Sequence, residues 1–499
     1  MNPDSLKRPS ARHRFPVAVR LFAILLLWTT NAAADEHVWL IGGGNNRRSS
    51  EAQIEQNIIW AARTLQSLPG RRRLHLYFTD GQDPGHDIKE IVPARDPSLE
   101  PLSRLYEFGR RHVVITRNHR VPGVLGGTAR DQLEPALERD FRNLHAGDRL
   151  LLVFNGHGTP ARRGFEQHRL WLWNDTWFEV RDLDRLLSQL PDGVSARFVL
   201  TQCYAGGFAR LVHPRAANTL ELTKGERCGF MASADDQPAE GCSASVDVGQ
   251  YRDYSTYFFA ALAGRARDGG PLLRSPDLDR DGKVSPYEAH LYAMVAAFSA
   301  DVPRATSEDF LDRWQQGLFR WRGRGHDVVQ TGNVYGRLAV ELARRAELDL
   351  QSNSFEQLWL QQRVIESQRV RRYRLELKRL ERQIADVQAK IIRDAEKDYP
   401  GLRKQAGKMG FTVPASLREA VARIRRHPQY QSLVETQNRE DAEELKLLDH
   451  QRRLARLERV DRLRKLSLWL HHFESTASEP EKTAYRRLLN CEKRPLGGP

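Results

Sequence analysis

A histidine and a cysteine each follow a short apolar run of the chain. A histidine can act as a base and a cysteine as a nucleophile, so the two could react together if the fold brings them close. The run Leu150–Phe154 leads into Asn-Gly-His157-Gly158, and the run Phe198–Thr201 leads into Gln-Cys203. If both runs are neighbouring parallel strands, their ends lie at the same edge of a sheet. An imidazole placed there can take the proton of a thiol, and the resulting thiolate can attack a carbonyl carbon.

The glycine beside the histidine adds a third part of this chemistry. The backbone amide of Gly158 can approach a developing oxyanion closely because no side chain obstructs it, and the amide of Cys203 is the natural second donor. The pattern therefore predicts acyl transfer with Cys203 as nucleophile and His157 as base. Taken singly, each residue has an ordinary alternative, since such a cysteine is usually core packing and such a histidine is usually a turn residue.

Segments typical of strands and helices alternate around these residues. Short apolar runs indicate strands at Val38–Ile41, Leu74–Phe78, Leu150–Phe154, Phe198–Thr201 and Phe230–Ala232. Helical patterns lie between them at Ala52–Leu68, Asp131–Leu144, Leu183–Leu190 and Tyr254–Leu262. This alternation predicts an α/β domain over residues 35–330, with a mostly parallel sheet flanked by helices.

The two motifs together resemble those of the caspase-like cysteine peptidases, and more closely those of the legumain-like branch with its bacterial relatives. In that family a histidine follows one strand in a motif ending His-Gly, and the nucleophile follows the next in a Cys-Tyr-Ser-Gly type motif. Here Asn155-Gly156-His157-Gly158 and Gln202-Cys203-Tyr204-Ala205-Gly206 match, with Ala for Ser. The resemblance covers about residues 35–320 and implies a caspase-like fold and a cysteine endopeptidase that acts on protein or peptide substrates.

The resemblance also implies where the substrate pocket lies. Segments containing Ser233 and Asp235, and the Asp253 that precedes Tyr-Ser, correspond to pocket walls, and Arg47 occupies a loop similar to one that supplies a basic pocket residue. Asp253 alone would favour Lys or Arg, whereas Arg47 beside Asp253 would suit the amide of Asn. We therefore expect cleavage after basic residues or Asn. The alternative is that these are solvated loop charges.

One acidic segment matches a calcium-binding loop. Its carboxylates would repel one another without a cation, and calcium takes oxygen ligands at this spacing. The expected ligands are Asp277, Asp279, Asp281, the carbonyl of Lys283, Ser285 and Glu288. The loop is single, so we expect a structural Ca²⁺ and no cofactor for the chemistry itself. The alternative is an acidic turn without an ion.

The first 34 residues have the pattern of a secretory signal peptide. Basic residues precede the apolar stretch Leu21–Trp28, and Ala32–Ala34 suits a signal peptidase. The alternative is a permanent anchor, although the stretch is only about half a spanning helix. We expect a secreted or periplasmic protein with no transmembrane segment in the mature chain. In an oxidising compartment we expect a disulfide between Cys228 and Cys242, which leaves Cys203 as a free nucleophile and Cys491 unpaired.

The composition changes from about residue 335. Apolar residues recur at heptad spacing, which predicts a basic helical coiled-coil region over 335–475 and a tail over 476–499. The seam comprises Val370, Tyr373, Leu377, Leu380, Ile384, Val387 and Ile391. Pro400 and Gly401 end this helix, and a second helix over Glu435–Leu470 either folds back on it or pairs with another chain. In the second arrangement the protein would self-associate through these helices.

The net charge of +14 is concentrated in this helical region, where about 32 basic residues face about 21 acidic ones after residue 350. Arginines at 369, 371, 372, 374, 379 and 382 either hold a polyanion or form the solvated face of a paired helix. Nucleic acid is not an expected partner. Two rival functions follow: an inactive caspase-like scaffold, and a polyanion-binding envelope protein. Composition excludes a chain that is disordered throughout and a multi-spanning membrane protein.

Overall fold

The computed structural model describes residues 35–93, 98, 100–106, 112–242, 247–316, 329–406 and 413–497. The signal peptide expected over residues 1–34 lies outside them. Residues 34–499 group into one compact unit. None of the helices in the described ranges combines the length and the apolar character needed to span a membrane.

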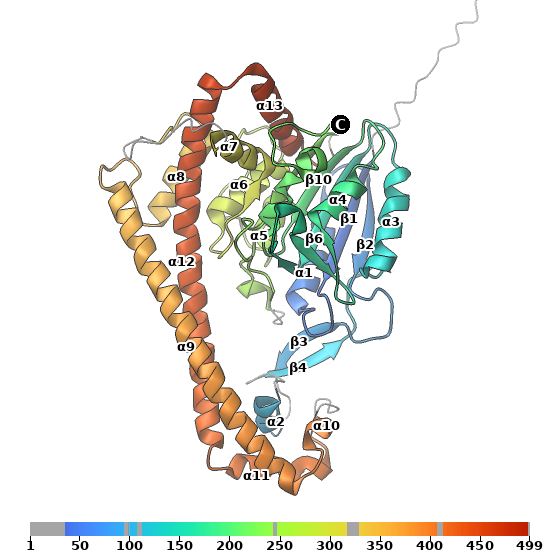
Figure 1. Cartoon of the computed structure of the whole chain (residues 1–499), viewed down its shortest axis with the longest axis vertical. Helices are drawn as coiled ribbons and strands as arrows, with labels where there is room; N and C mark the ends of the chain where they lie inside the picture. Colours follow the sequence, from blue (N-terminus) through green and yellow to red (C-terminus); the bar gives the residue numbers. More distant parts are fainter. Residues whose placement is uncertain are drawn as a thin grey trace, which may run out of the picture. The chain divides into compact units, whose positions relative to one another are not determined.

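A seven-stranded sheet forms the centre of the α/β region (Figure 1). All neighbouring strands are parallel except the β11–β12 pair. In order across the sheet, the strands are β12 (Arg304–Ala305), β11 (Arg227–Met231), β10 (Ser195–Leu200), β6 (Arg149–Gly156), β1 (Glu36–Gly43), β2 (Arg72–Phe78) and β5 (Val124–Gly126). The central strands β6 and β10 are buried almost throughout, as expected for a parallel sheet that is covered on both faces.

Two sets of helices flank the sheet. Helix α1 (Ala52–Ser67) packs against α5 (Tyr254–Ala263), which packs against α6 (Pro286–Ala296). Helix α3 (Arg130–Arg142) packs against α4 (Val180–Leu187). The α/β prediction is confirmed, and the five strands and four helices expected from the sequence all form, with ends that differ by a few residues.

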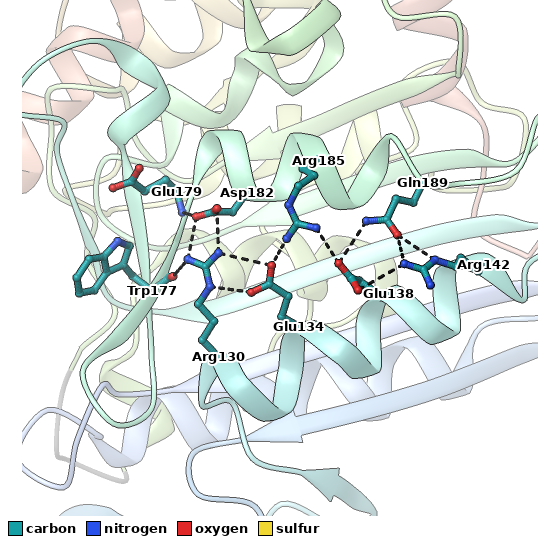
Figure 2. Close-up of polar contacts among 9 residues, drawn as sticks. All are labelled: Arg130, Glu134, Glu138, Arg142, Trp177, Glu179, Asp182, Arg185 and Gln189. Carbon is teal, nitrogen blue, oxygen red and sulfur yellow. Dashed lines mark hydrogen bonds and ion pairs between the residues drawn. The ribbon is translucent and has the colours of Figure 1, made fainter.

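A ladder of charged groups joins α3 to α4 (Figure 2). Arg130 binds Glu134 one turn along α3 at 2.7 Å and Asp182 in the first turn of α4 at 2.9 Å. Arg185 continues the ladder by donating to Glu138 at 2.7 Å. These contacts hold α4 beside α3, and α4 leads into β10 and hence to Cys203.

Smaller elements surround the main sheet. Strands β3 (Ile88–Pro93) and β4 (His112–Arg117) form an antiparallel pair. Helix α2 (Glu100–Leu105) lies between them in the sequence. After β6, strands β7 (Gly158–Thr159), β8 (Arg169–Leu172) and β9 (Thr176–Glu179) form a short antiparallel sheet. These pieces are absent from our sequence interpretation. Strands β7, β8 and β9 have only two to four residues, which is too short to show a clear periodicity.

Two long helices dominate the C-terminal region. Helices α9 (Phe355–Asp398) and α12 (Tyr430–Thr476) lie side by side in Figure 1 and run antiparallel. Trp359 near the start of α9 donates to the Leu457 carbonyl at 3.0 Å, whereas Glu376 further along pairs with Arg439 at 2.6 Å. The second helix therefore folds back within the same chain. The seam residues Val370, Leu377, Leu380, Ile384 and Ile391 are buried.

Further helices connect and close this region: α7 (Thr306–Gln316), α8 (Val334–Arg345), α10 (Leu402–Ala406), α11 (Arg418–Arg426) and α13 (Glu479–Lys493). Helix α12 also contacts the α/β region, because Arg462 binds Glu308 of α7 at 3.0 Å and the buried Arg459 donates to the Ala297 carbonyl at 2.8 Å. The helical region and the sheet region are thus packed on each other.

The expected Cys228–Cys242 disulfide is wrong, because Cys228 pairs with Cys491. Cys228 lies near the amino end of β11, and α13 packs against that strand. Cys242 follows the carboxyl end of β11, so the strand separates it from Cys228. The thiols of Cys203 and Cys242 are both free.

Candidate active site

The carboxyl ends of β6 and β10 bring His157 and Cys203 to one edge of the sheet. Phe154 and Leu200 are register partners, and the Thr201 amide donates to the Phe154 carbonyl at 3.0 Å. Just beyond the strands, a Cβ on Gly158 would lie 2.3 Å from the carbonyl oxygen of Cys203. Only glycine permits this approach, which places the His-Gly turn directly against the cysteine.

Both ring nitrogens of His157 have defined neighbours. Its Nε2 lies 2.6 Å from the Ser49 carbonyl and 3.1 Å from the Glu51 carboxylate, and Nδ1 lies 3.6 Å from the Cys242 sulfur. Burial by itself would lower the pKa of His157, but the hydrogen bonds to Cys242 and Glu51 outweigh it and raise this pKa to about 11. Both ring nitrogens are therefore engaged, and Nδ1 lies on the side of the Cys242 sulfur.

Cys203 lies at a sharp turn after β10. The next residue, Tyr204, has a left-handed backbone with φ of 60°, and the 3₁₀ helix Ala205–Val212 follows at once. The Cys203 sulfur is half-buried and accepts a hydrogen bond from the Ala239 amide at 3.2 Å. Burial raises the pKa of the Cys203 thiol, and this effect exceeds the opposing influence of Ala239 and His157.

The loop that follows β11 lies over these two residues. Besides Ala239 and Cys242, it contributes the Gln237 carbonyl, which accepts from the Tyr204 amide at 2.9 Å. The Glu240 amide donates to Asp301 at 2.6 Å, and the Glu240 carboxylate binds Arg452 of α12 at 3.2 Å. We call residues 234–242 the cover loop, because it contacts both candidate catalytic side chains, Cys203 through Ala239 and His157 through Cys242.

Asp253 is placed inside the protein rather than along an open wall. It is 2% exposed and caps α5, accepting from the Thr256 amide. Its carboxylate also accepts from Gln53 at 2.8 Å and from Asn57 at 3.2 Å, both on α1. These bonds explain its buried position, since a buried carboxylate needs such donors.

The other expected pocket residues are spread around the turn. Ser233 is fully buried and supports the nucleophile turn by accepting from the Ala205 amide at 3.2 Å. Asp235 is half-buried, and its carbonyl lies 2.9 Å from His168 Nε2. Arg47 is exposed and lies near Gly85, whereas the carboxylate of Asp253 is bound by side chains of α1. Among the described residues, the structure therefore does not bring Arg47 and Asp253 together.

Glu51 and Cys242 are the neighbours of His157 that our sequence interpretation missed. Glu51 immediately precedes α1 and is separated from His157 by more than one hundred residues. A carboxylate just before a helix is a common first-turn feature, so the sequence held no distinctive signal for its role. The sequence interpretation places Cys242 in a disulfide, so it does not predict a free Cys242 thiol beside His157.

The acidic loop before α6 fits a calcium ion in part. Carboxylate oxygens of Asp277, Asp279 and Asp281 all lie within 4.8 Å of one another, as oxygens around one Ca²⁺ at 2.3–2.6 Å do. Gly282 adopts φ of 81° at the turn, and the Lys283 amide donates to Asp281 at 2.8 Å.

The last two expected ligands have another use in this structure. Ser285 and Glu288 form a capping box at the start of α6, and Glu288 also accepts from the Leu278 amide at 2.7 Å. Glu288 therefore connects the acidic loop to the helix. It would join the coordination of an ion only by exchanging these bonds.

Comparisons with known proteins do not show a family for this chain. No family model and no curated protein matches the chain. Twenty-two chains of known structure match it, among them the protein GSU0716 from Geobacter sulfurreducens. That crystal structure is 11% identical in sequence, covers 55% of this chain and 92% of its own, and has a TM-score of 0.30.

Proposed function

We propose that the protein is an exported cysteine endopeptidase of the caspase and legumain type, with Cys203 as nucleophile and His157 as base. One observation carries the proposal. The two side chains follow adjacent central strands, and the glycine after the histidine lies against the carbonyl of the cysteine. Such neighbouring positions support the proposal, because a nucleophile and its base must be able to come within hydrogen-bond reach of one another.

The proposed reaction has two halves. The step needs the neutral ring of His157, which is favoured once Cys242, whose contact raises the His157 pKa, has moved away. The neutral ring accepts the Cys203 proton, and the sulfur bonds to the substrate carbonyl carbon while Gly158 offers its amide to the oxyanion. The carbon–nitrogen bond then breaks, the amine leaves with the proton from His157, and a thioester remains on Cys203. Water attacks the thioester with His157 again taking a proton, which releases the acid and restores the thiol.

The cover loop must move for this reaction to occur. Cys242 holds Nδ1 of His157, and Ala239 holds the sulfur of Cys203, so neither group is free for a substrate. A peptide that enters the site would replace both contacts. Cys242 therefore acts as a competitor for the histidine in the resting protein, and its loss should favour activity.

For specificity we propose cleavage after Lys or Arg, with Asn as the second choice. Asp253 is already satisfied by α1, so the acidic groups that favour a basic guest are those nearer the surface, Asp235 and Asp236. A structural Ca²⁺ on the loop of Asp277, Asp279 and Asp281 completes the proposal. Its chemistry is to neutralise the crowded carboxylates, with no step in peptide hydrolysis.

The test is cleavage of a peptide library with varied residues before the scissile bond, under reducing conditions. The wild type should cleave, Cys203→Ala should lose at least about a thousandfold in turnover, and the matched variant Cys242→Ala should equal or exceed the wild type. Equal losses in both variants would reject Cys203 as the single nucleophile. No cleavage by the wild type at all would favour the inactive scaffold, and a preference for Asp would reject the acidic pocket.

A further inference from the structure

A cavity of about 500 Å³ lies among α8, α9 and α12, and none of its lining residues belongs to the candidate active site. Four arginines line it: Arg345 at the end of α8, Arg369 on α9, and Arg453 and Arg456 on α12. Three helices that are distant in sequence thus direct cationic side chains into one cavity. This arrangement differs from a row of arginines along a single solvated helix face.

Several charged groups near the cavity take part in ion pairs. Glu366, one of its two lining carboxylates, accepts from Arg369 at 2.8 Å and from His450 at 2.6 Å. Arg345 pairs with Glu341 at 2.8 Å, and Arg453 pairs with Asp449 one turn away. Ion pairs at the surface contribute little free energy, so these guanidinium groups can leave their carboxylate partners and bind a ligand.

Arg456 is the central cation of the cavity. Its guanidinium group donates to the Arg345 carbonyl at 3.0 Å and lies over the Phe298 ring at 4.7 Å. Burial lowers the pKa of Arg456, and the nearby charges of Arg345 and Arg453 lower it further, against a weaker effect of Asp449. The charges that act on Arg456 are therefore mainly positive, with Glu347 and Glu366 as the carboxylates of the cavity lining, and a bound anion would offset this excess.

The cavity also has an apolar wall, formed by Phe298, Ile365 and Leu457. Small-molecule sites commonly combine such a wall with a few convergent polar groups. A phosphate monoester carries nearly two negative charges and three acceptor oxygens, and the planar guanidinium fork matches it. From this combination we infer that the cavity binds an organic phosphate, with the phosphate among Arg345, Arg453 and Arg456 and the organic part against Phe298.

The inference is tested by calorimetric titration of the full-length mature protein with phenyl phosphate, with phenol as the uncharged control. We expect saturable one-to-one binding of phenyl phosphate, weaker binding of inorganic phosphate and none of phenol. Arg456→Gln should weaken binding by about tenfold or more, since it removes a charge-assisted hydrogen-bond donor. Arg371→Gln, an exposed arginine of α9 outside the cavity, should change it less than twofold.

Equal weakening by Arg456→Gln and Arg371→Gln would overturn the inference, as would the absence of saturable binding to the wild type. If Arg456→Gln fails to fold, the exposed Arg453→Gln decides by the same criterion. Vesicles of phosphatidylcholine with and without phosphatidic acid distinguish the source of the phosphate. Binding to phosphatidic acid vesicles that Arg456→Gln abolishes indicates a lipid headgroup, and phenyl phosphate binding without vesicle binding indicates a free small molecule.

Discussion

At the scale of single residues, His157 is controlled from both sides of its ring. The Ser49 carbonyl and Glu51 hold Nε2, and this leaves Nδ1 for a sulfur atom. When Nε2 of a histidine base is held by hydrogen bonds, the ring keeps one orientation, and the proton on Nε2 keeps its place. In the proposed peptidase Glu51 is therefore a positioning residue, because it acts on the substrate only through His157.

Replacing Glu51 by Gln should lower the pKa of His157 by about one unit or more, because a neutral amide stabilises the imidazolium less. The folded-state pKa of about 11 exceeds the ordinary value of 6.5, so the charged ring stabilises the fold below pH 6.5. That contribution declines as the pH rises through 11. NMR titration of the His157 ring measures the change, and Glu138→Gln on the remote α3 is the control. An unaltered titration in Glu51→Gln would contradict the assigned role.

At the scale of elements, the seam of α9 offers a matched pair of substitutions. Leu377 is 7% exposed against α12, whereas Leu375 on the same helix is 60% exposed. Leu377→Asp buries an unpaired charge and should cost about 3–5 kcal/mol in the free energy of unfolding, while Leu375→Asp should cost less than about 0.5 kcal/mol. Urea unfolding followed by circular dichroism measures both. Similar small losses would show that the helices do not depend on this seam.

The acidic loop before α6 is the element where an ion should act. Millimolar Ca²⁺ should raise the melting temperature, because a ligand bound only by the folded state stabilises that state by mass action. Asp279→Ala should remove the increase, and Asp131→Ala, an exposed acid on α3, should retain it. Identical melting curves in chelator and in calcium would count against the site.

The elements were also the most predictable part of the molecule. Apolar runs such as Leu150–Phe154 are long enough to indicate a buried strand, and they give the order of strands and helices correctly. The sequence does not decide whether α12 returns onto α9, because heptad spacing indicates which face of a helix is buried and not which helix covers it. Nothing in the sequence indicates that Arg459 and Arg462 pack onto the α/β region.

At the scale of the whole molecule, the Cys228–Cys491 disulfide joins the sheet to the last helix across 263 residues of sequence. Cys491→Ser should lower the free energy of unfolding by about 2–5 kcal/mol, since the link restricts the unfolded chain. Chemical denaturation without reductant measures this loss. With reductant, the free energies of unfolding of wild type and Cys491→Ser should become more similar. Equal free energies of unfolding without reductant would show that the disulfide does not form.

The candidate site shows why such long-range features escape the sequence. His157, Gly158 and Cys203 were identifiable because each lies directly after a recognisable strand. Glu51 and Cys242 reach the same point from other parts of the chain, and only the folded sheet brings them together. The buried position of Asp253 likewise depends on α1, which the local sequence around residue 253 does not reveal.

The central claim, that Cys203 is a nucleophile served by His157, is tested most directly by locating a covalent adduct. The mature protein is treated with a peptidyl acyloxymethyl ketone ending in Lys, and peptide mass spectrometry then identifies the labelled thiol. We predict labelling of Cys203 in the wild type and in Cys242→Ala, with strongly reduced labelling in His157→Ala. Labelling confined to Cys242, or equal labelling of Cys203 with and without His157, would contradict the claim.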